Sequence, residues 1–207
     1  MLLITAIIIS YLVGSIPTAY LAGRILKGID IREFGSGNIG ATNALRVLGK
    51  KTGFIVLLVD VLKGIVPVIL LGNYVLSQNK ALSQEFVYIC IAASCVIGHI
   101  WTIFLKFKGG KGVATSLGVL IGISLKLHAV AISLGIMLVI WLAVFMIFRM
   151  VSLASVIAAL AFPACIFILK QPLSLFIFAF ILSFLVAWRH RANILRIIQG
   201  KEPRLKL

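Results

Sequence analysis

The sequence predicts an all-α integral membrane protein with about seven transmembrane helices, its N-terminus outside the cell and its C-terminus in the cytoplasm. The chain of 207 residues is 62% hydrophobic and only 12% charged, with a mean hydropathy of +1.18. Soluble domains are about a quarter charged. Several apolar runs approach the ~20 residues that a helix needs to cross a bilayer, and lysines and arginines are concentrated in every second connecting segment.

The expected spans are the apolar runs at residues 2–23, 53–72, 86–105, 113–125, 129–148, 151–169 and 173–188. Gly14, Pro17 and Gly23 lead the first run into more apolar sequence without a signal-peptide cleavage pattern, so we expect it to remain as a span. The run 113–125 would be about 20 Å long as a helix, shorter than a hydrocarbon core of about 30 Å. It is therefore either a short span covered by its neighbours or a re-entrant segment. Because no internal repeat divides the sequence, we expect residues 1–207 to form one polytopic domain.

The distribution of basic residues indicates the orientation. With seven crossings, the loops on one side and the C-terminal tail carry sixteen lysines and arginines, whereas the opposite loops carry three. The positive-inside rule places the basic side in the cytoplasm. A five-span arrangement without the short run 113–125 and one neighbour keeps most of this asymmetry. The net charge of +15 fits anionic lipid and anionic substrates in such a protein, and we expect no nucleic-acid partner.

Polar residues gather on the predicted cytoplasmic side in four segments. These are "FGSGNIGATNALRVLGKK" (34–51), "GHIWTIFLKFKGGKGVAT" (98–115), "SLAS" (152–155) and "WRHRANILRIIQGKE" (188–202). Glycine amides beside lysines suit a phosphate, and Lys111 lies at the start of an apolar helix whose N-terminus favours anions. Four segments with polar residues on one side favour a binding site there, since such residues are costly in a bilayer and usually mark function.

Other site types are excluded by context. The Gly35-x-Gly37-x-x-Gly40 pattern lacks the βαβ unit that a dinucleotide site needs, and Gly110-Lys111 is followed by glycine, unlike a P-loop. Asp60 and Lys63, at i and i+3 within a predicted span, are interpreted as a structural ion pair. His99, at the end of a span, is expected to be a hydrogen-bonded packing residue. The three cysteines (Cys90, Cys95 and Cys165) lie inside apolar runs and are interpreted as buried hydrophobic residues.

The inventory of acids limits the chemistry. The five acids are Asp30, Glu33, Asp60, Glu85 and Glu202, and none is spaced for a carboxylate dyad or a metal site. The sequence also contains no GxSxG elbow and no histidine followed closely by aspartate. Acyl transfer from an already activated donor with a good leaving group fits this inventory, because the protein would contribute mainly positioning and charge stabilisation.

Three segments, "GSGNIGATN", "GHIWTIFLKFKGGKGVAT" and "RHRANILRIIQGKE", resemble in order and spacing the signature motifs of the bacterial acyl-phosphate:glycerol-3-phosphate acyltransferases (PlsY family). The intervening "LVDVLKG" and "VSLAS" are similar to that family as well, so the resemblance covers nearly the whole chain. It implies a multi-pass inner-membrane enzyme with its active site at the cytoplasmic face. The implied reaction moves a fatty acyl group from acyl phosphate to the 1-hydroxyl of glycerol 3-phosphate, giving lysophosphatidate, with no cofactor and no metal.

The resemblance also implies roles for individual residues. The family's contacts to glycerol phosphate and phosphate would fall on Ser36, Arg46, Lys111, Ser155, His190 and Asn193. Of these, His190, Asn193 and Lys111 are expected to be catalytic. The rest of the expected substrate site comprises Gly37, Asn38, Thr42, Asn43, Lys108, Gly109, Gly110 and Gly112. Besides both substrates and membrane lipid, the expected partners include the soluble enzyme that makes acyl phosphate.

Two roles remain open for His190. It is either a general base or a hydrogen-bond donor that orients the substrate while a phosphate oxygen receives the hydroxyl proton. The sequence also departs from the family's usual motifs at Thr102, where proline is usual, and at Lys201, where threonine is usual. Thr102 is expected to remove a helix kink near His99, whereas Lys201 adds only a surface charge.

Two other classes of function were weighed. A transporter or channel for an organic phosphate would also have many spans and a basic vestibule. It would, however, tend to show an inverted repeat and polar residues across the midplane, and the sequence has neither. A structural scaffold for lipid-synthesis enzymes would leave the glycines, His190 and Asn193 unexplained.

Overall fold

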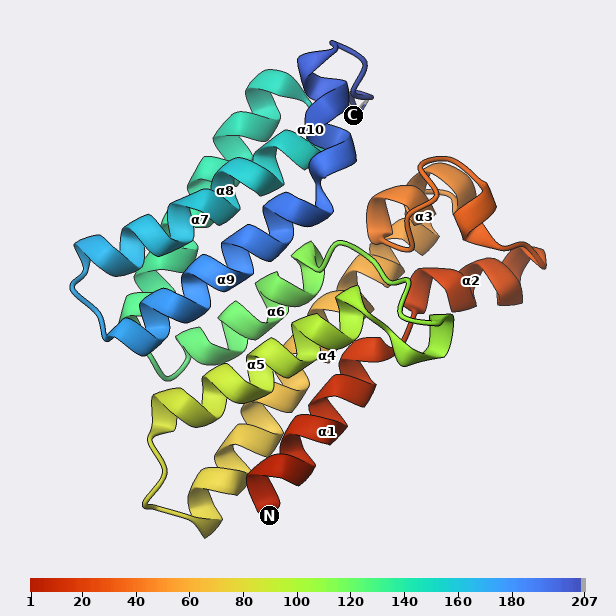
Figure 1. Ribbon diagram of the computed structural model, residues 1–207. Coiled ribbons are helices and arrows are strands. Elements are labelled where there is room, and N and C mark those ends of the chain that lie inside the picture. The colour runs from red at the N-terminus through yellow and green to blue at the C-terminus, as the bar shows by residue number, and fades with distance from the viewer. Residues whose placement is uncertain (206–207) are drawn as a thin grey trace. The chain divides into compact units, whose positions relative to one another are not determined.

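The computed structural model describes residues 1–205, which form helices and connecting loops with no strand, and confirms the predicted all-helical membrane fold. The helices form two compact units, Met1–Ile123 and Ser124–Leu207 (Figure 1). That residues 1–207 form one polytopic domain stays a prediction.

The first unit is built around three long helices. Its helices are α1 (Leu2–Ser15), α2 (Thr18–Lys27), α3 (Ala41–Leu48), α4 (Lys50–Gln78), α5 (Gln84–Ile100) and α6 (Val113–Ser124), with 3-10 turns η1 (Ile31–Glu33) and η2 (Ile103–Leu105). Helices α1, α4 and α5 pack on one another, and the short α2 and α3 pack together on α4. Figure 1 shows the N-terminus and the α4–α5 connection at one end of this unit, and α2 and α3 at the other.

The first expected span is interrupted between α1 and α2, although Leu2–Lys27 as a whole is long and apolar enough to cross a membrane. Pro17 has no backbone N–H to donate and disfavours helical geometry at Ile16, whose backbone is extended at φ −56° and ψ 115°. The break releases two carbonyl groups inside the unit. The Ile16 oxygen accepts a hydrogen bond from Lys63 Nζ at 2.9 Å, and the Ser15 oxygen accepts one from Thr102 Oγ1 at 2.5 Å.

The ion pair predicted within α4 is confirmed. Lys63 Nζ lies 2.8 Å from Asp60 Oδ1, and both side chains are buried. Thr18 Oγ1, at the start of α2, donates to the same carboxylate oxygen at 3.0 Å. A buried charge requires such partners because removal from water is expensive. The pair therefore joins α4 to the break between α1 and α2.

Glycines let α6 approach α4 closely. A Cβ atom at Gly118 would overlap the carbonyl oxygen of Val61, and one at Gly64 would lie 2.5 Å from the Thr115 oxygen. Close backbone contact through small residues is typical of helix pairs in membranes. The short α6 is consequently packed tightly against a long neighbour, and its residues Gly118, Val119 and Leu120 are buried.

The second unit comprises α7 (His128–Phe148), α8 (Val151–Ile168), α9 (Leu173–Arg189) and α10 (Arg191–Ile198). Helix α8 packs against both α7 and α9, and the rings of Phe162 and Phe178 meet edge to face at 6.4 Å. The chain bends by 60° between α9 and α10. His190 lies at this bend.

Each expected span corresponds to a helix or a broken helix, but not all are long enough to cross a bilayer alone. Among the described residues, five segments have the required length and apolar composition, and the bent α9–α10 pair would make six. Helix α6, with 12 residues, extends about 18 Å. The number of crossings and the side on which each terminus lies remain predictions.

The close contact between α4 and α6 can be tested by adding one methyl group. Gly118→Ala should lower the melting temperature in detergent by about 5 °C, because a well-packed interface accommodates extra volume poorly. Gly135→Ala is the matched control, since a Cβ atom at Gly135 in α7 meets nothing within 4 Å and alanine favours a helix. Equal melting temperatures for both variants would contradict the close approach.

Candidate active site

The first polar loop is organised by one buried amide. Asn43, in the first turn of α3, accepts a hydrogen bond from the Ser36 amide at 2.8 Å through Oδ1. Its Nδ2 donates to the carbonyl oxygens of Ile31 at 3.2 Å and Phe34 at 3.1 Å. These bonds hold the segment 31–36 on α3. Asn43 therefore shapes the loop from within, and its expected place among the substrate-binding residues stays a prediction.

The glycines of this loop meet local backbone requirements. Gly35 and Gly37 have φ of +62° and +70°, a region that residues with side chains rarely adopt. A Cβ atom at Gly35 would also overlap Asn43 Oδ1. Ser36, between the two glycines, is exposed together with Gly37, while Asn38 and Thr42 are half-buried.

Some arginines in and beside this loop are paired with an acid, whereas in the described part of the chain Arg46 is not. Asp30 Oδ2 lies 2.6 Å from Arg32 and 3.6 Å from Arg24. The hydrogen bond from Arg32 lowers the pKa of the Asp30 carboxyl to about 2, so this acid stays ionised and neutralises nearby positive charge. Arg46 is exposed, and its guanidinium group forms no hydrogen bond or ion pair within residues 1–205. Arg46 can therefore accept an anionic ligand.

The glycine–lysine segment is tied to the end of α5. The Gly109 amide donates to the Ile100 oxygen at 3.1 Å, and the Gly110 amide donates to the His99 oxygen at 3.0 Å. A Cβ atom at either glycine would overlap His99 or Ile100. These two glycines therefore allow the segment to approach α5 closely, and their expected place in the substrate site stays a prediction.

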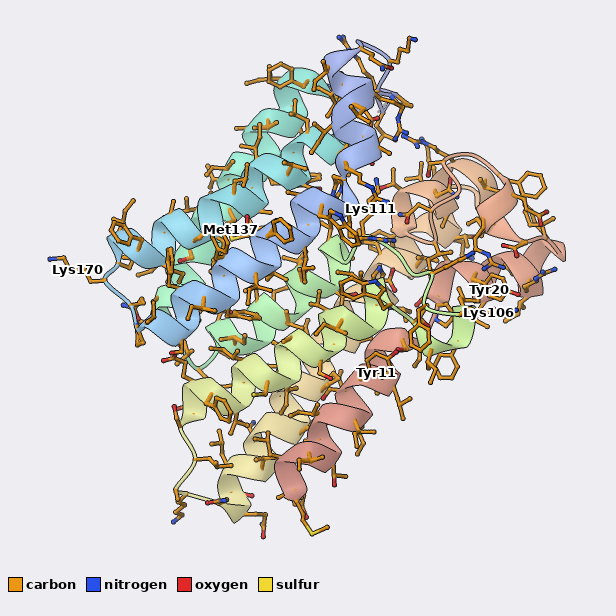
Figure 2. The ribbon with its side chains drawn as sticks, viewed as in Figure 1. Tyr11, Tyr20, Lys106, Lys111, Met137 and Lys170 are labelled. Atoms are coloured by element: carbon orange, nitrogen blue, oxygen red, sulfur yellow. The ribbon has the colours of Figure 1, made fainter. Side chains whose placement is uncertain are left out.

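The three lysines of this segment differ in burial. Lys106 and Lys108 are exposed, whereas Lys111 is half-buried and precedes α6 by two residues (Figure 2). Gly112 has φ of +83° and its carbonyl oxygen accepts the Ser116 amide at 2.7 Å. An ammonium group beside a helix N-terminus creates a local environment that favours anions.

Packing brings the two polar segments of the first unit together. Leu105, in η2 just before the glycines, belongs to the same buried apolar cluster as Ile39 and Ala44 of the first loop. The chain also leaves the helix at the end of α5, contrary to the expectation that Thr102 removes the break. Thr102 has φ of −68°, a value that proline would also adopt, and its hydroxyl accepts the Phe104 amide at 3.3 Å.

In the second unit, His190 is buried at the bend between α9 and α10. Its Nδ1 atom lies 2.7 Å from the Val186 carbonyl oxygen. Because a carbonyl oxygen only accepts hydrogen bonds, Nδ1 carries a proton. The ring orientation is thereby fixed by a neutral backbone group, and a neutral ring has its lone pair on Nε2.

Asn193 is held by Glu202, an acid for which no sequence motif indicates a role. Glu202 Oε1 accepts hydrogen bonds from Asn193 Nδ2 and Ser152 Oγ, both at 2.6 Å, and Oε2 accepts one from Arg196 Nε at 2.8 Å. Burial tends to raise the pKa of Glu202, but these three hydrogen bonds outweigh it and lower the pKa from its usual value of 4.5. The ionised carboxylate therefore joins α8 to α10. The sequence carried one signal for Glu202: it is the only acid in the basic C-terminal tail.

Ser155 also has partners within the protein. Its hydroxyl group donates to the Val151 oxygen at 2.8 Å and accepts from Trp141 Nε1 at 3.2 Å. Trp141, which belongs to none of the sequence motifs, stacks on Phe145 with ring centroids 5.1 Å apart. Ser155 thus links α8 to α7, and its expected contact with substrate stays a prediction.

The described residues contain no cluster of three or more His, Cys, Asp or Glu side chains that could hold a metal ion. The chemistry that the geometry favours is anion binding. In the first unit, the groups suited to an anion are the exposed Arg46 and Lys108 and the half-buried Lys111. In the second unit, the buried side chains of His190 and Asn193 lie near the bend between α9 and α10.

Known proteins of one family match this chain along nearly its whole length. The pattern of the family described as glycerol-3-phosphate acyltransferase matches residues 4–200. A glycerol-3-phosphate acyltransferase of Prochlorococcus marinus (strain NATL1A) is 45% identical over 199 residues, which cover 94% of each chain. Another, of Staphylococcus haemolyticus (strain JCSC1435), is 40% identical over 209 residues and covers 100% of this chain and 99% of its own.

Solved structures are similar as well. The crystal structure of PlsY (YgiH), an integral membrane glycerol 3-phosphate acyltransferase, in its glycerol 3-phosphate form is 36% identical with a TM-score of 0.84. The match covers 99% of this chain and 96% of that chain. The lysophosphatidic acid form of the same protein matches with a TM-score of 0.81.

The Glu202 carboxylate predicts a pH-dependent stability. Because its pKa is lowered in the folded protein, it stabilises the fold above the usual pKa, and this contribution is lost as the pH falls through the folded-state pKa. Glu202→Gln should cost about 2 kcal/mol at pH 7, and its melting temperature should converge with that of the wild type once the pH falls below the lowered folded-state pKa of Glu202. The exposed Glu33→Gln is the control. A difference that persists unchanged at low pH would contradict an ionised Glu202.

Proposed function

The chain belongs to the glycerol-3-phosphate acyltransferase family, and from this premise we propose that it transfers a fatty acyl group from acyl phosphate to glycerol 3-phosphate. The 1-hydroxyl oxygen forms an ester bond with the acyl carbon, and the bond between that carbon and the phosphate oxygen breaks. The products are lysophosphatidate and phosphate, the hydroxyl proton leaving with a base or with the phosphate. The glycerol 3-phosphate and lysophosphatidic acid forms of the similar crystal structure support this substrate and product.

The observation that carries the proposal is the basic end of the first unit, where Lys111 is half-buried before α6 and Arg46 is exposed with no side-chain partner among residues 1–205. Lys111 binds a phosphate group as a compact charge at a helix start, and Arg46 binds one through the planar fork of its guanidinium group. Ser36 lies in the same polar segment as Arg46, and Lys108 lies in the same segment as Lys111. Both are exposed and contribute secondary contacts to the phosphate. Phosphate leaving an acyl phosphate needs little acid, which fits a chain with five acids.

His190 and Asn193 act on the glycerol moiety. The Val186 carbonyl, a neutral acceptor, holds His190 Nδ1 at 2.7 Å, whereas a carboxylate at that position would raise the basicity of the ring more strongly. We therefore favour a role in which His190 orients the hydroxyl group and a phosphate oxygen receives the proton. Asn193, held by Glu202, presents its amide in one orientation.

The protein resides in the bacterial inner membrane with its active site at the cytoplasmic face. The N-terminus lies outside, because the loops with sixteen lysines and arginines then face the cytoplasm, against three on the other side. Acyl phosphate comes from a soluble enzyme on that side. Several apolar helices with exposed leucine, isoleucine and phenylalanine side chains support insertion in lipid.

One turnover experiment tests the function. Purified protein given acyl phosphate and glycerol 3-phosphate should release lysophosphatidate and phosphate in equal amounts, while acyl-CoA in place of acyl phosphate should give none. A transporter of organic phosphate would instead move glycerol 3-phosphate into vesicles without making lysophosphatidate, and that result would overturn the proposal.

The two lysines should differ in importance. Lys111→Ala should lower kcat/KM by ~10²-fold or more, because a partly desolvated ammonium–phosphate contact is worth a few kcal/mol. Lys108→Ala should be mild, since Lys108 is exposed and screened by solvent. Steady-state kinetics of both purified variants provide the measurement. Equal, mild losses would contradict the assignment of Lys111.

The role of His190 should be visible in kinetics across pH. An orienting residue allows His190→Gln to keep measurable activity, with the loss mostly in KM for glycerol 3-phosphate. A general base typically supplies roughly 10²–10⁴-fold in rate. If kcat of the wild type titrates near neutral pH, and His190→Gln abolishes this titration with kcat down roughly a thousandfold, His190 is the base.

A further inference from the structure

The buried imidazole of His99 contacts the chain on both sides of Lys111. We propose that His99 is a positioning residue for Lys111, which it holds in place through Gly110 and through Thr115. The inference rests on the proposed function, since it concerns how that function's phosphate ligand is placed. The sequence suggested only a hydrogen-bonded packing role for this histidine.

The contact before Lys111 involves both the backbone and the ring. The His99 carbonyl oxygen accepts the Gly110 amide at 3.0 Å. A Cβ atom at Gly110 would overlap His99 Nε2, so the imidazole lies directly against the Gly110 backbone. Gly110 is the residue that immediately precedes Lys111, and any side chain there would have to displace the ring.

The contact after Lys111 is a side-chain hydrogen bond. His99 Nδ1 lies 3.1 Å from Thr115 Oγ1, and Thr115 is buried in the first turn of α6. One rigid ring therefore touches the residue before Lys111 and the residue four positions after it. The orientation of the Lys111 backbone relative to α5 depends on both contacts.

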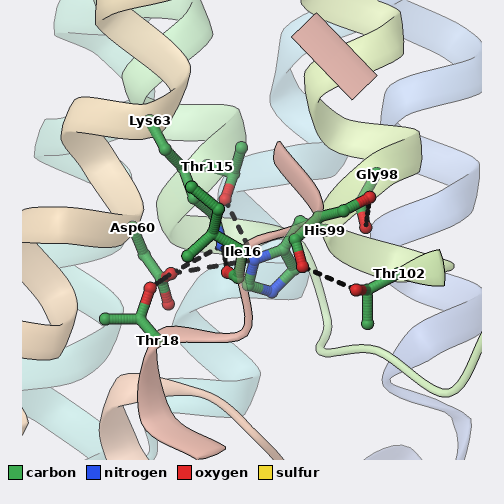
Figure 3. A network of polar contacts seen from close by, with 9 residues as sticks. Ile16, Thr18, Asp60, Lys63, Gly98, His99, Thr102 and Thr115 are labelled. Atoms are coloured by element: carbon green, nitrogen blue, oxygen red, sulfur yellow. Dashed lines mark hydrogen bonds and ion pairs between the residues drawn. The ribbon is translucent and has the colours of Figure 1, made fainter. Parts of the chain in front are cut away.

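The ring is itself fixed by buried charges (Figure 3). Asp60 Oδ1 lies 3.9 Å from His99 Nδ1, and the same oxygen is held by Lys63 at 2.8 Å and Thr18 at 3.0 Å. Lys63 also donates to the Ile16 carbonyl oxygen at 2.9 Å. Through His99, the break between α1 and α2 and the ion pair of α4 support the glycine–lysine segment.

A positioning role differs from a purely structural one in what a variant changes. His99 is buried and acts through its neighbours, so weakening its contacts should disturb phosphate binding by Lys111 more than the stability of the fold. A structural role would lower stability and would affect kinetics equally whether or not Lys111 is present. Comparing the effect of one substitution in the presence and in the absence of Lys111 measures the coupling between the two residues.

Thr115→Val carries the test, because it replaces only the hydroxyl group by a methyl group, whereas His99→Gln removes both contacts of the ring and risks misfolding. It should raise KM for glycerol 3-phosphate about tenfold, the effect of one lost hydrogen bond of ordinary strength, with kcat within about threefold. Thr115→Ser should restore the wild-type KM. Ser10→Ala, which removes another buried hydroxyl of the first unit, should leave the kinetics unchanged.

The decisive comparison repeats Thr115→Val in a Lys111→Ala background. There the substitution should change KM less than twofold, since the lysine that it displaces is already absent. An equal, tenfold effect in both backgrounds, or wild-type kinetics for Thr115→Val alone, would overturn the proposal.

Hydrogen exchange of segment 109–116 gives a readout that does not depend on turnover. Thr115→Val should speed exchange of the Gly109 and Gly110 amides about tenfold, and Ser10→Ala should not. If the wild type failed the turnover assay, the proposed function would be wrong, while this measurement would still decide whether Thr115 and His99 hold the segment. Unchanged exchange in Thr115→Val would overturn the positioning role.

Discussion

The first unit depends on one constraint: the carbonyl groups at the end of α5 must find donors inside an apolar bundle. The last carbonyls of a helix have no partner within it, and buried ones are costly when unpaired. Four successive carbonyl oxygens are satisfied by four separate donors: Gly98 by Ser15 Oγ, His99 by the Gly110 amide, Ile100 by the Gly109 amide and Trp101 by Tyr11 OH. Two donors come from α1 and two from the glycine–lysine segment, so the end of α5 holds both.

In the second unit, a short polar segment is held by the side chain of Glu202 instead of by backbone carbonyl groups. Here Glu202 folds back beneath α10, and its carboxylate gathers Ser152, Asn193 and Arg196. A buried charge with several donors is stable where a partly paired one would not be. The backbone acceptors at α5 and the carboxylate acceptor at α10 thus have the same effect. Each fixes a short polar segment at the end of long apolar helices.

These constraints give some of the glycines and polar residues a structural role. Gly109 and Gly110 permit close approach to α5, and Asn43 organises its own loop. The cations proposed to bind phosphate, Lys111 and Arg46, are longer and less buried. Short, buried polar residues build the frame, and flexible cations extend from it, because only the latter can reach a ligand while their backbone is held elsewhere.

The sequence by itself determined the helical membrane fold, the approximate position of each apolar helix and the in-helix pair Asp60–Lys63, because hydrophobic run length and i, i+3 spacing are local properties. Pro17 also carried a local signal for the break in the first span, which the apolar run concealed. Only the tertiary structure decided which distant groups pair. His99 meets Thr115 across a loop, and Ser152 meets Glu202 fifty positions away. No local pattern encodes such contacts, because they depend on how packed helices place their ends in space.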